Sequence, residues 1–194
     1  MDKQVIITIG REYGSGGHVI AQDIAKRFNV PYYNRNLIEE VAKQNNFDTD
    51  NIKDYDESPR KYLFSRTVQG YSNSPEEILA GLQFDFIKEK AASGESFVIV
   101  GRCADYVLKE RVNIFNVFVQ ASLYYRLKRV VDVYGESEKK AGEIILKNDK
   151  RRANYYNYHV GEKWTNLTNY DMVVRSDIAG IDKAVESICT YLGE

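Results

Sequence analysis

Apolar residues along the chain gather into short continuous runs, separated by longer segments in which they recur every three or four positions. Three runs rich in β-branched and aromatic residues, at 5–9, 96–100 and 114–119, are typical of strands buried on both faces of a parallel sheet. Shorter segments at 31–34 and 170–174 indicate two further strands. The pattern therefore predicts a sheet of about five strands.

The segments between these runs have the apolar period of helices packed on a sheet. A start signal is clear at Ser74, which precedes a proline and is followed by the acid Glu77. The predicted helices run from the glycine-rich turn to about Asn29, from Asn36 to about Lys43, from Ser74 through Phe86, from Ser122 through Val131, from about Ser137 to Tyr156, and from Ile181 through Leu192. Residues 45–73 are polar and irregular. Alternating strands and helices predict an α/β layered fold with right-handed crossovers, and we expect one domain over 1–194 because the sequence shows no repeat or linker.

The overall composition is that of a globular chain. Hydrophobic residues make up 43% and the formal net charge is −1, so no global field draws the chain to nucleic acid or to an anionic membrane. No apolar run approaches the roughly 20 residues that span a bilayer, and the amino terminus lacks the layout of a signal peptide. Cys103 and Cys189 lie far apart and only two histidines are present, which argues against a zinc site. We expect a cytoplasmic protein without a metal cluster, in which any anion site is local.

A glycine-rich turn follows the first predicted strand and leads into the first predicted helix. Four glycines fall within residues 10–17. Glycine lets the backbone approach an anion closely, and the amides and dipole at a helix amino terminus attract phosphate. The position and composition of this turn predict a phosphate-binding loop. The alternative is that the turn holds no ligand. The candidate loop residues are Gly10, Arg11, Tyr13, Gly14, Ser15, Gly16, Gly17 and His18.

This loop departs from the standard Walker A pattern, G-x-x-x-x-G-K-[ST]. Alignment of residues 14–16 with the end of that pattern places Gly17 at the lysine and His18 at the serine or threonine that contacts magnesium. A dinucleotide-binding fingerprint fails as well, because Val19 stands where a third glycine or alanine is required. A chain that transfers phosphoryl groups with this loop would need cations from other residues.

Several motifs in order along the chain carry a resemblance to a known family. They are ITIGREYGSGGH at 7–18, PYYNR at 31–35, GRCAD at 101–105, DKRRA at 149–153 and NYD at 169–171. With these motifs the sequence resembles the cytidylate kinase-like family, divergent relatives of the bacterial cytidylate kinases. The resemblance implies a three-layer P-loop NTPase-type fold, in which helices flank a parallel sheet. It also implies an acceptor-binding insertion at about 35–95 and a helical lid at about 133–160.

The activity that the resemblance implies is transfer of the γ-phosphoryl group of ATP, with Mg²⁺, to CMP, dCMP or a related phosphate acceptor. Such transfer depends on positioning and on cations around the phosphoryl group, for which Arg11 of the loop is one candidate. The candidate catalytic residues are Arg102, Lys150, Arg151 and Arg152, and the candidate acceptor-binding residues are Asn34, Arg35, Arg102 and Asp105. Cys103 stands where cytidylate kinases carry the aspartate of a G-R-D motif, and Asp105 is the nearby acid that would take over its role. The ordinary alternatives are a surface salt bridge for Arg102 and a solvated helix face for residues 150–152.

Two other classes of function stay open at the level of the sequence. A nucleotide- or anion-binding module with little catalysis would explain the missing lysine and hydroxyl. An interaction protein is the third class, with the tyrosine-rich segment 155–158 contacting a partner or a second copy in a homo-oligomer. We expect Glu12 to pair with Arg11 or another loop cation, because an unpaired acid would repel a phosphate ligand.

Overall fold

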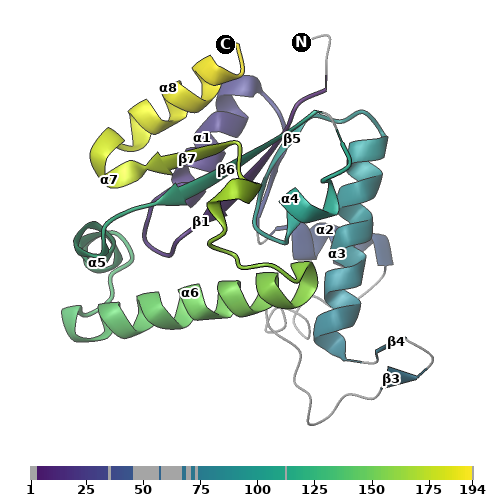
Figure 1. Cartoon of the computed structure of the whole chain (residues 1–194), viewed down its shortest axis with the longest axis horizontal. Coiled ribbons are helices and arrows are strands. Elements are labelled where there is room, and N and C mark those ends of the chain that lie inside the picture. Colours follow the sequence, from purple (N-terminus) through teal and green to yellow (C-terminus); the bar gives the residue numbers. More distant parts are fainter. Residues whose placement is uncertain are drawn as a thin grey trace.

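Five parallel strands form the centre of the molecule, as the apolar runs predict. The computed structural model describes residues 4–34, 36–45, 57, 67–68, 71–72, 74–111 and 113–193. The strands of the main sheet are β1 (Ile6–Arg11), β2 (Tyr32–Tyr33), β5 (Phe97–Val100), β6 (Ile114–Gln120) and β7 (Met172–Arg175). Their order is β2-β5-β1-β6-β7, and all four pairings between neighbours are parallel (Figure 1).

The strand order places β1 where the chain changes direction across the sheet. β5 and β2 lie on one side of β1, and β6 and β7 lie on the other. The register sets Ile9 of β1 beside Val100 of β5 and Val117 of β6. In open α/β sheets, ligands bind in the crevice outside the carboxyl ends of the strands at such a switch point. The loop after β1 and the turn after β5 therefore meet at one edge of the sheet.

Helices cover both faces of this sheet and complete three layers (Figure 1). The helices are α1 (Gly17–Phe28), α2 (Leu37–Asn45), α3 (Pro75–Ala92), α4 (Ala104–Val107), α5 (Leu123–Asp132), α6 (Glu138–Val160), α7 (Ser176–Ala179) and α8 (Ile181–Tyr191). On one face α1 and α8 pack with Ile7 and Ile9 of β1. On the other face α2 and α3 pack with Ile6, so β1 is buried on both sides. This burial is why its sequence is continuously apolar rather than alternating.

The structure departs from the predicted elements in a few places. α4 and α7 are single turns, too short to show a helical period in the sequence. A short antiparallel pair, β3 (Thr67–Val68) with β4 (Tyr71–Ser72), lies in the segment predicted to be irregular. α6 continues to Val160, past its predicted end. Among the described residues, no helix has both the length and the apolar character needed to cross a bilayer.

Candidate active site

The loop after β1 turns at Gly16 into the amino terminus of α1. Gly16 has a φ of 84°, which favours glycine, and a Cβ atom there would lie 2.5 Å from Cδ1 of Ile181. In the part of the chain that the structure describes, the amides of Gly14 and Gly16 donate no hydrogen bond. Amides left open beside a helix amino terminus are the donors that an anion needs. The backbone of the loop therefore has the features of a phosphate cradle.

Ser15 holds the shape of this loop from inside. Its hydroxyl donates to the carbonyl of Glu12 at 2.8 Å and accepts from the amide of Gly17 at 3.4 Å. Its carbonyl accepts a 2.5 Å hydrogen bond from the hydroxyl of Ser176, in the first turn of α7. Ser15 is fully buried, so the role that the structure gives this candidate is to fix the loop.

A cavity of about 300 Å³ opens in front of the loop. It brings together the loop, the residue that follows β2, the turn after β5 and the middle of α6. The lining residues are Arg11, Glu12, Tyr13, Gly14, Gly16, Gly17, His18, Asn34, Glu57, Arg102, Tyr134, Arg151 and Arg152. Most of the candidates from the sequence motifs thus meet in one place, at the switch point of the sheet.

Glu57 lies among the arginines of this cavity, although the sequence pattern gave it no role. Its carboxylate is paired in two places with Arg11, at 3.1 Å from Nη1 and 3.4 Å from Nη2. Nη1 of Arg102 lies 3.6 Å from the same carboxylate. Burial acts to raise the pKa of this carboxyl, but the charges of Arg11, Arg102 and Arg152 outweigh burial and hold the pKa well below its usual range. Glu57 is therefore a buried anion held by cations that line the cavity.

The turn after β5 places Arg102 in this cluster through an uncommon backbone. Residues 101–103 have φ values of 76°, 55° and 51°, so three left-handed residues follow one another. For residues with a side chain, that conformation costs about 1–2 kcal/mol each. Arg102 is only 1% exposed, and its Nη1 donates to the carbonyl of Val100 at 3.1 Å. The surface salt-bridge alternative for Arg102 is thus wrong, because the side chain is buried at the carboxyl end of β5.

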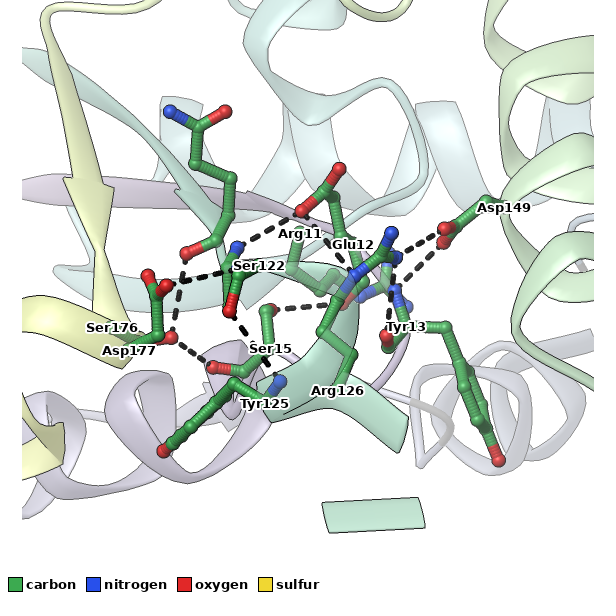
Figure 2. A network of polar contacts seen from close by, with 12 residues as sticks. Arg11, Glu12, Tyr13, Ser15, Ser122, Tyr125, Arg126, Asp149, Ser176 and Asp177 are labelled. Atoms are coloured by element: carbon green, nitrogen blue, oxygen red, sulfur yellow. Dashed lines mark hydrogen bonds and ion pairs between the residues drawn. The ribbon is translucent and has the colours of Figure 1, made fainter. Parts of the chain in front are cut away.

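A polar network ties the loop to α5 and α6 (Figure 2). Arg126 of α5 donates to Asp149 of α6 at 2.5 Å and to the carbonyl of Tyr13 at 3.4 Å. Asp149 also accepts from the amide of Tyr13 at 2.7 Å. Glu12 accepts from the amide of Ala121 at 2.9 Å and lies 3.7 Å from Nε of Arg126. Glu12 is paired, as expected, but its cation comes from α5 rather than from the loop.

α6 presents two of its three candidate cations to the cavity. Arg152 donates to the carbonyl of Arg11 at 3.0 Å, and its guanidinium lies 5.5 Å from the ring centre of Tyr13. Burial and the neighbouring Arg11 cation lower the pKa of Arg152 to about 9. The Nε atoms of Arg151 and Arg152 are buried without a hydrogen-bond partner among the described residues. Lys150 is exposed and does not line the cavity, so the solvated-face alternative holds for this residue alone.

His18 and Asn34 stand at the rim of the cavity. Nδ1 of His18 lies 2.9 Å from the side-chain amide of Asn34 and 2.5 Å from the hydroxyl of Tyr32. Burial raises the pKa of Tyr32 to about 12, so its hydroxyl stays protonated. With the Asn34 amide donating to Nδ1, the proton of a neutral imidazole sits on Nε2. Arg35, the other candidate in this segment, lies outside the described residues.

Two candidates face a second, smaller cavity of about 20 Å³ rather than the main one. Asp105 accepts from the hydroxyl of Tyr156 at 2.6 Å, and burial raises the pKa of its carboxyl. Gly10 packs in the sheet, where a Cβ atom would come 2.8 Å from the ring of Phe118. Cys103 is buried, and burial raises its pKa, as expected of an inert thiol.

The described residues do not form a magnesium site of their own. They contain no group of three or more histidines, cysteines or acids placed to hold a metal. Both acids of the main cavity are committed, Glu12 to an amide and Arg126, and Glu57 to arginines. Mg²⁺ needs oxygen ligands such as free carboxylates, phosphates and water. Such an ion would therefore be held by the phosphates of a ligand rather than by these side chains.

The fold is that of the P-loop kinases, in which phosphate groups bind at the end of the strand that precedes the loop. The chain belongs to the cytidylate kinase-like family, whose model matches residues 6–178. The expected family and the expected three-layer fold are thus confirmed.

Solved structures share this fold. An uncharacterized protein from Eubacterium ventriosum is 33% identical, with 97% of this chain and 98% of that chain covered and a TM-score of 0.77. Shikimate kinase from Bacteroides thetaiotaomicron is 13% identical, with 98% and 99% covered and a TM-score of 0.58. Shikimate kinase from Aquifex aeolicus is 16% identical, with 97% and 96% covered and a TM-score of 0.52. At these low identities the shikimate kinases share the fold alone. A search of the curated proteins finds no match.

Proposed function

We propose that this protein is an ATP-dependent phosphotransferase of the nucleoside monophosphate kinase type, which transfers the γ-phosphoryl group to CMP, dCMP or a related phosphate acceptor. One observation carries the proposal: open loop amides and four arginines converge on a single cavity at the switch point of the sheet. The kinase character of the family and of the fold neighbours supports it.

The charge of the cavity fits a phosphate monoester. Among the described residues, four arginines and two acids line it, and their charges sum to two positive charges that can meet a dianion. Phosphoryl transfer needs little covalent help and depends on cations and donors that are already in place. The buried Nε atoms of Arg151 and Arg152, which have no partner among the described residues, supply donors of that kind.

Arg11 is our candidate for the cation that a loop lysine would otherwise provide. A Cβ atom at Gly17 would lie 2.6 Å from Cβ of Arg11. The Arg11 side chain thus passes through the space that a side chain at position 17 would enter. Arg11, the last residue of β1, also lines the cavity. Its charge could therefore take the place of the missing lysine charge.

The test is an assay of ADP formed from ATP and Mg²⁺ with each nucleoside monophosphate in turn. We expect turnover with at least one acceptor, and a loss of 10³-fold or so in the Arg152→Ala variant, by analogy with arginine fingers. Lys150→Ala is the matched control, since Lys150 is the exposed neighbour on the same helix. No ADP above background with any acceptor would overturn the proposal.

A nucleotide-binding module without turnover is the second candidate. The observation that favours it is that the amide and carbonyl of Tyr13, within the loop, are already occupied by Asp149 and Arg126. Calorimetry separates the two: binding of ATP without turnover supports the module.

The third class of function was an interaction protein that contacts a partner through residues 155–158. Two tyrosines of this segment are not open to a partner, because Tyr155 and Tyr156 are only 3% and 5% exposed.

A further inference from the structure

Glu57 is an acid at the centre of a site that attracts anions. It is 6% exposed and lies in a stretch that the sequence pattern leaves irregular. An acid in such a place would weaken phosphate binding by repulsion unless its charge does something else there. Two roles are open to it: to stand in for the phosphate until a ligand displaces it, or to hold the arginines in place while the ligand binds beside them.

The contacts favour the second role. Both oxygens of Glu57 are used by one guanidinium, Arg11, in a forked pair, and one of the oxygens also faces Arg102. A forked pair fixes the plane of a guanidinium as well as its position. A guanidinium carries five N–H donors, so Arg11 keeps donors beyond the two that reach the carboxylate.

The backbone beneath the pair is shaped to receive it. A Cβ atom on Gly101 would lie 2.2 Å from Oε1 of Glu57 and 2.4 Å from Nη1 of Arg11. The carboxylate and the guanidinium therefore rest directly on the main chain at that glycine. Glu57 itself has a φ of 48°, a left-handed conformation that a residue with a side chain rarely adopts. Strain of this kind clusters at functional sites, where the surroundings over-determine it.

The charges lead to the same conclusion. The described charged groups around this carboxylate are the guanidiniums of Arg11, Arg102 and Arg152. Without the carboxylate, three like charges would face one another in a buried place and would move apart. The nearby acids Glu12 and Asp149 are both already engaged by Arg126.

We propose that Glu57 is a positioning residue, which fixes the guanidinium group of Arg11 so that its remaining donors face the phosphate in the cavity. The inference rests on the proposed function in that it takes Arg11 to be a phosphate ligand. It assigns Glu57 no contact with the reacting atoms.

The experiment compares three variants with the wild-type chain. Glu57→Gln keeps the shape and removes the charge, whereas Glu57→Asp keeps the charge on a shorter side chain. Glu89→Gln is the control, because it makes the same change of charge at an exposed position of α3. Each protein is measured for turnover, for the Kd of ATP by calorimetry, and for the arginine side-chain N–H signals by NMR without ligand. Thermal unfolding shows that each variant is folded.

For Glu57→Gln we expect turnover to fall on the order of 10²-fold, the effect of misplacing a positioning group by about 1 Å. The Kd of ATP should change far less than turnover, because the cations remain. The Nη–H signals of Arg11, which a forked pair keeps separate, should merge as its guanidinium becomes free to rotate. Glu57→Asp should recover part of the turnover, and Glu89→Gln should match the wild type.

Three results would overturn the inference. If Glu57→Gln bound ATP or inorganic phosphate at least tenfold more tightly than the wild type and kept its turnover, Glu57 would be a group that occupies the phosphate site until a ligand displaces it. Unchanged turnover with unchanged affinity would show a purely structural ion pair. Arginine signals that do not change in Glu57→Gln would show that the carboxylate does not orient them. If the wild-type chain itself forms no ADP, the proposed function fails, while the NMR comparison still decides whether Glu57 orients the arginines.

Discussion

Replacing Gly101 by alanine tests whether the buried ion pair rests on the main chain as the structure has it. The added Cβ would overlap Oε1 of Glu57 at 2.2 Å and Nη1 of Arg11 at 2.4 Å. Alanine at a φ of 76° costs about 1–2 kcal/mol, and displacing one partner from a buried pair costs about 3–5 kcal/mol. We therefore expect Gly101→Ala to lose about 4–7 kcal/mol of unfolding free energy, together with its ATP affinity.

The matched control is Gly94→Ala. Gly94 has a φ of 85°, yet a Cβ atom there would meet nothing within 4 Å. This variant isolates the backbone strain, about 1–2 kcal/mol, from the collision. Urea unfolding measures both losses. In a Glu57→Ala background, the loss from Gly101→Ala should shrink toward that of the control, because the carboxylate is gone and no longer holds the Arg11 guanidinium against Gly101. Equal losses for the two glycines in the wild-type background would show that the ion pair does not rest on the main chain at Gly101.

Three further predictions concern the loop, the sheet and acid stability. Arg126→Ala should weaken ATP binding tenfold or so by calorimetry, since it removes a charge-assisted bond of the kind worth about 1.5–3 kcal/mol and frees the loop from α6. Gly10→Ala should lose about 1–3 kcal/mol in urea unfolding through overpacking, while the affinity of the folded fraction for ATP stays the same, because Gly10 packs on Phe118 rather than on the main cavity. Glu57 has a depressed pKa in the folded state, so its contribution to stability is present above its unfolded pKa near 4.3 and is lost as the pH falls below that value. The stability difference between the wild type and Glu57→Gln should therefore shrink between about pH 5 and pH 3, and a constant difference would contradict the assigned pairing.

The sequence was enough to predict the main sheet and the convergence of the site. Buried parallel strands need continuous apolar runs, so β1, β5 and β6 stand out in the sequence, and the carboxyl ends of such strands share one edge. Arg11 and Arg102, far apart in the chain, were both candidates from the motifs, and this shared edge brings them to one cavity. The resemblance to the family predicted in addition that arginines of α6 belong to the site.

The parts that were not predicted depend on long-range partners. Glu57 sits in a polar stretch without periodicity, and only the fold reveals that three arginines surround it. Arg126 follows the ordinary helical pattern of α5, so nothing local marks it as the partner of the loop. Lys150 and Arg151 are adjacent basic residues that the sequence does not distinguish. The orientation of α6 about its axis decides that Arg151 lines the cavity and Lys150 does not. Asp105 was predicted from its motif to bind the acceptor, yet its carboxylate accepts from Tyr156 and lines the smaller cavity.

The activity that we propose for the main cavity is transfer of the γ-phosphoryl group of ATP to a nucleoside monophosphate. The most direct test follows that group itself: the wild-type chain is incubated with ATP labelled at the γ-phosphate, Mg²⁺ and each nucleoside monophosphate, and the products are separated. We expect label in the nucleoside diphosphate of at least one acceptor, CMP or dCMP foremost, and little in the Arg152→Ala variant. Label that stays in ATP, or appears only as inorganic phosphate, with every acceptor would contradict it.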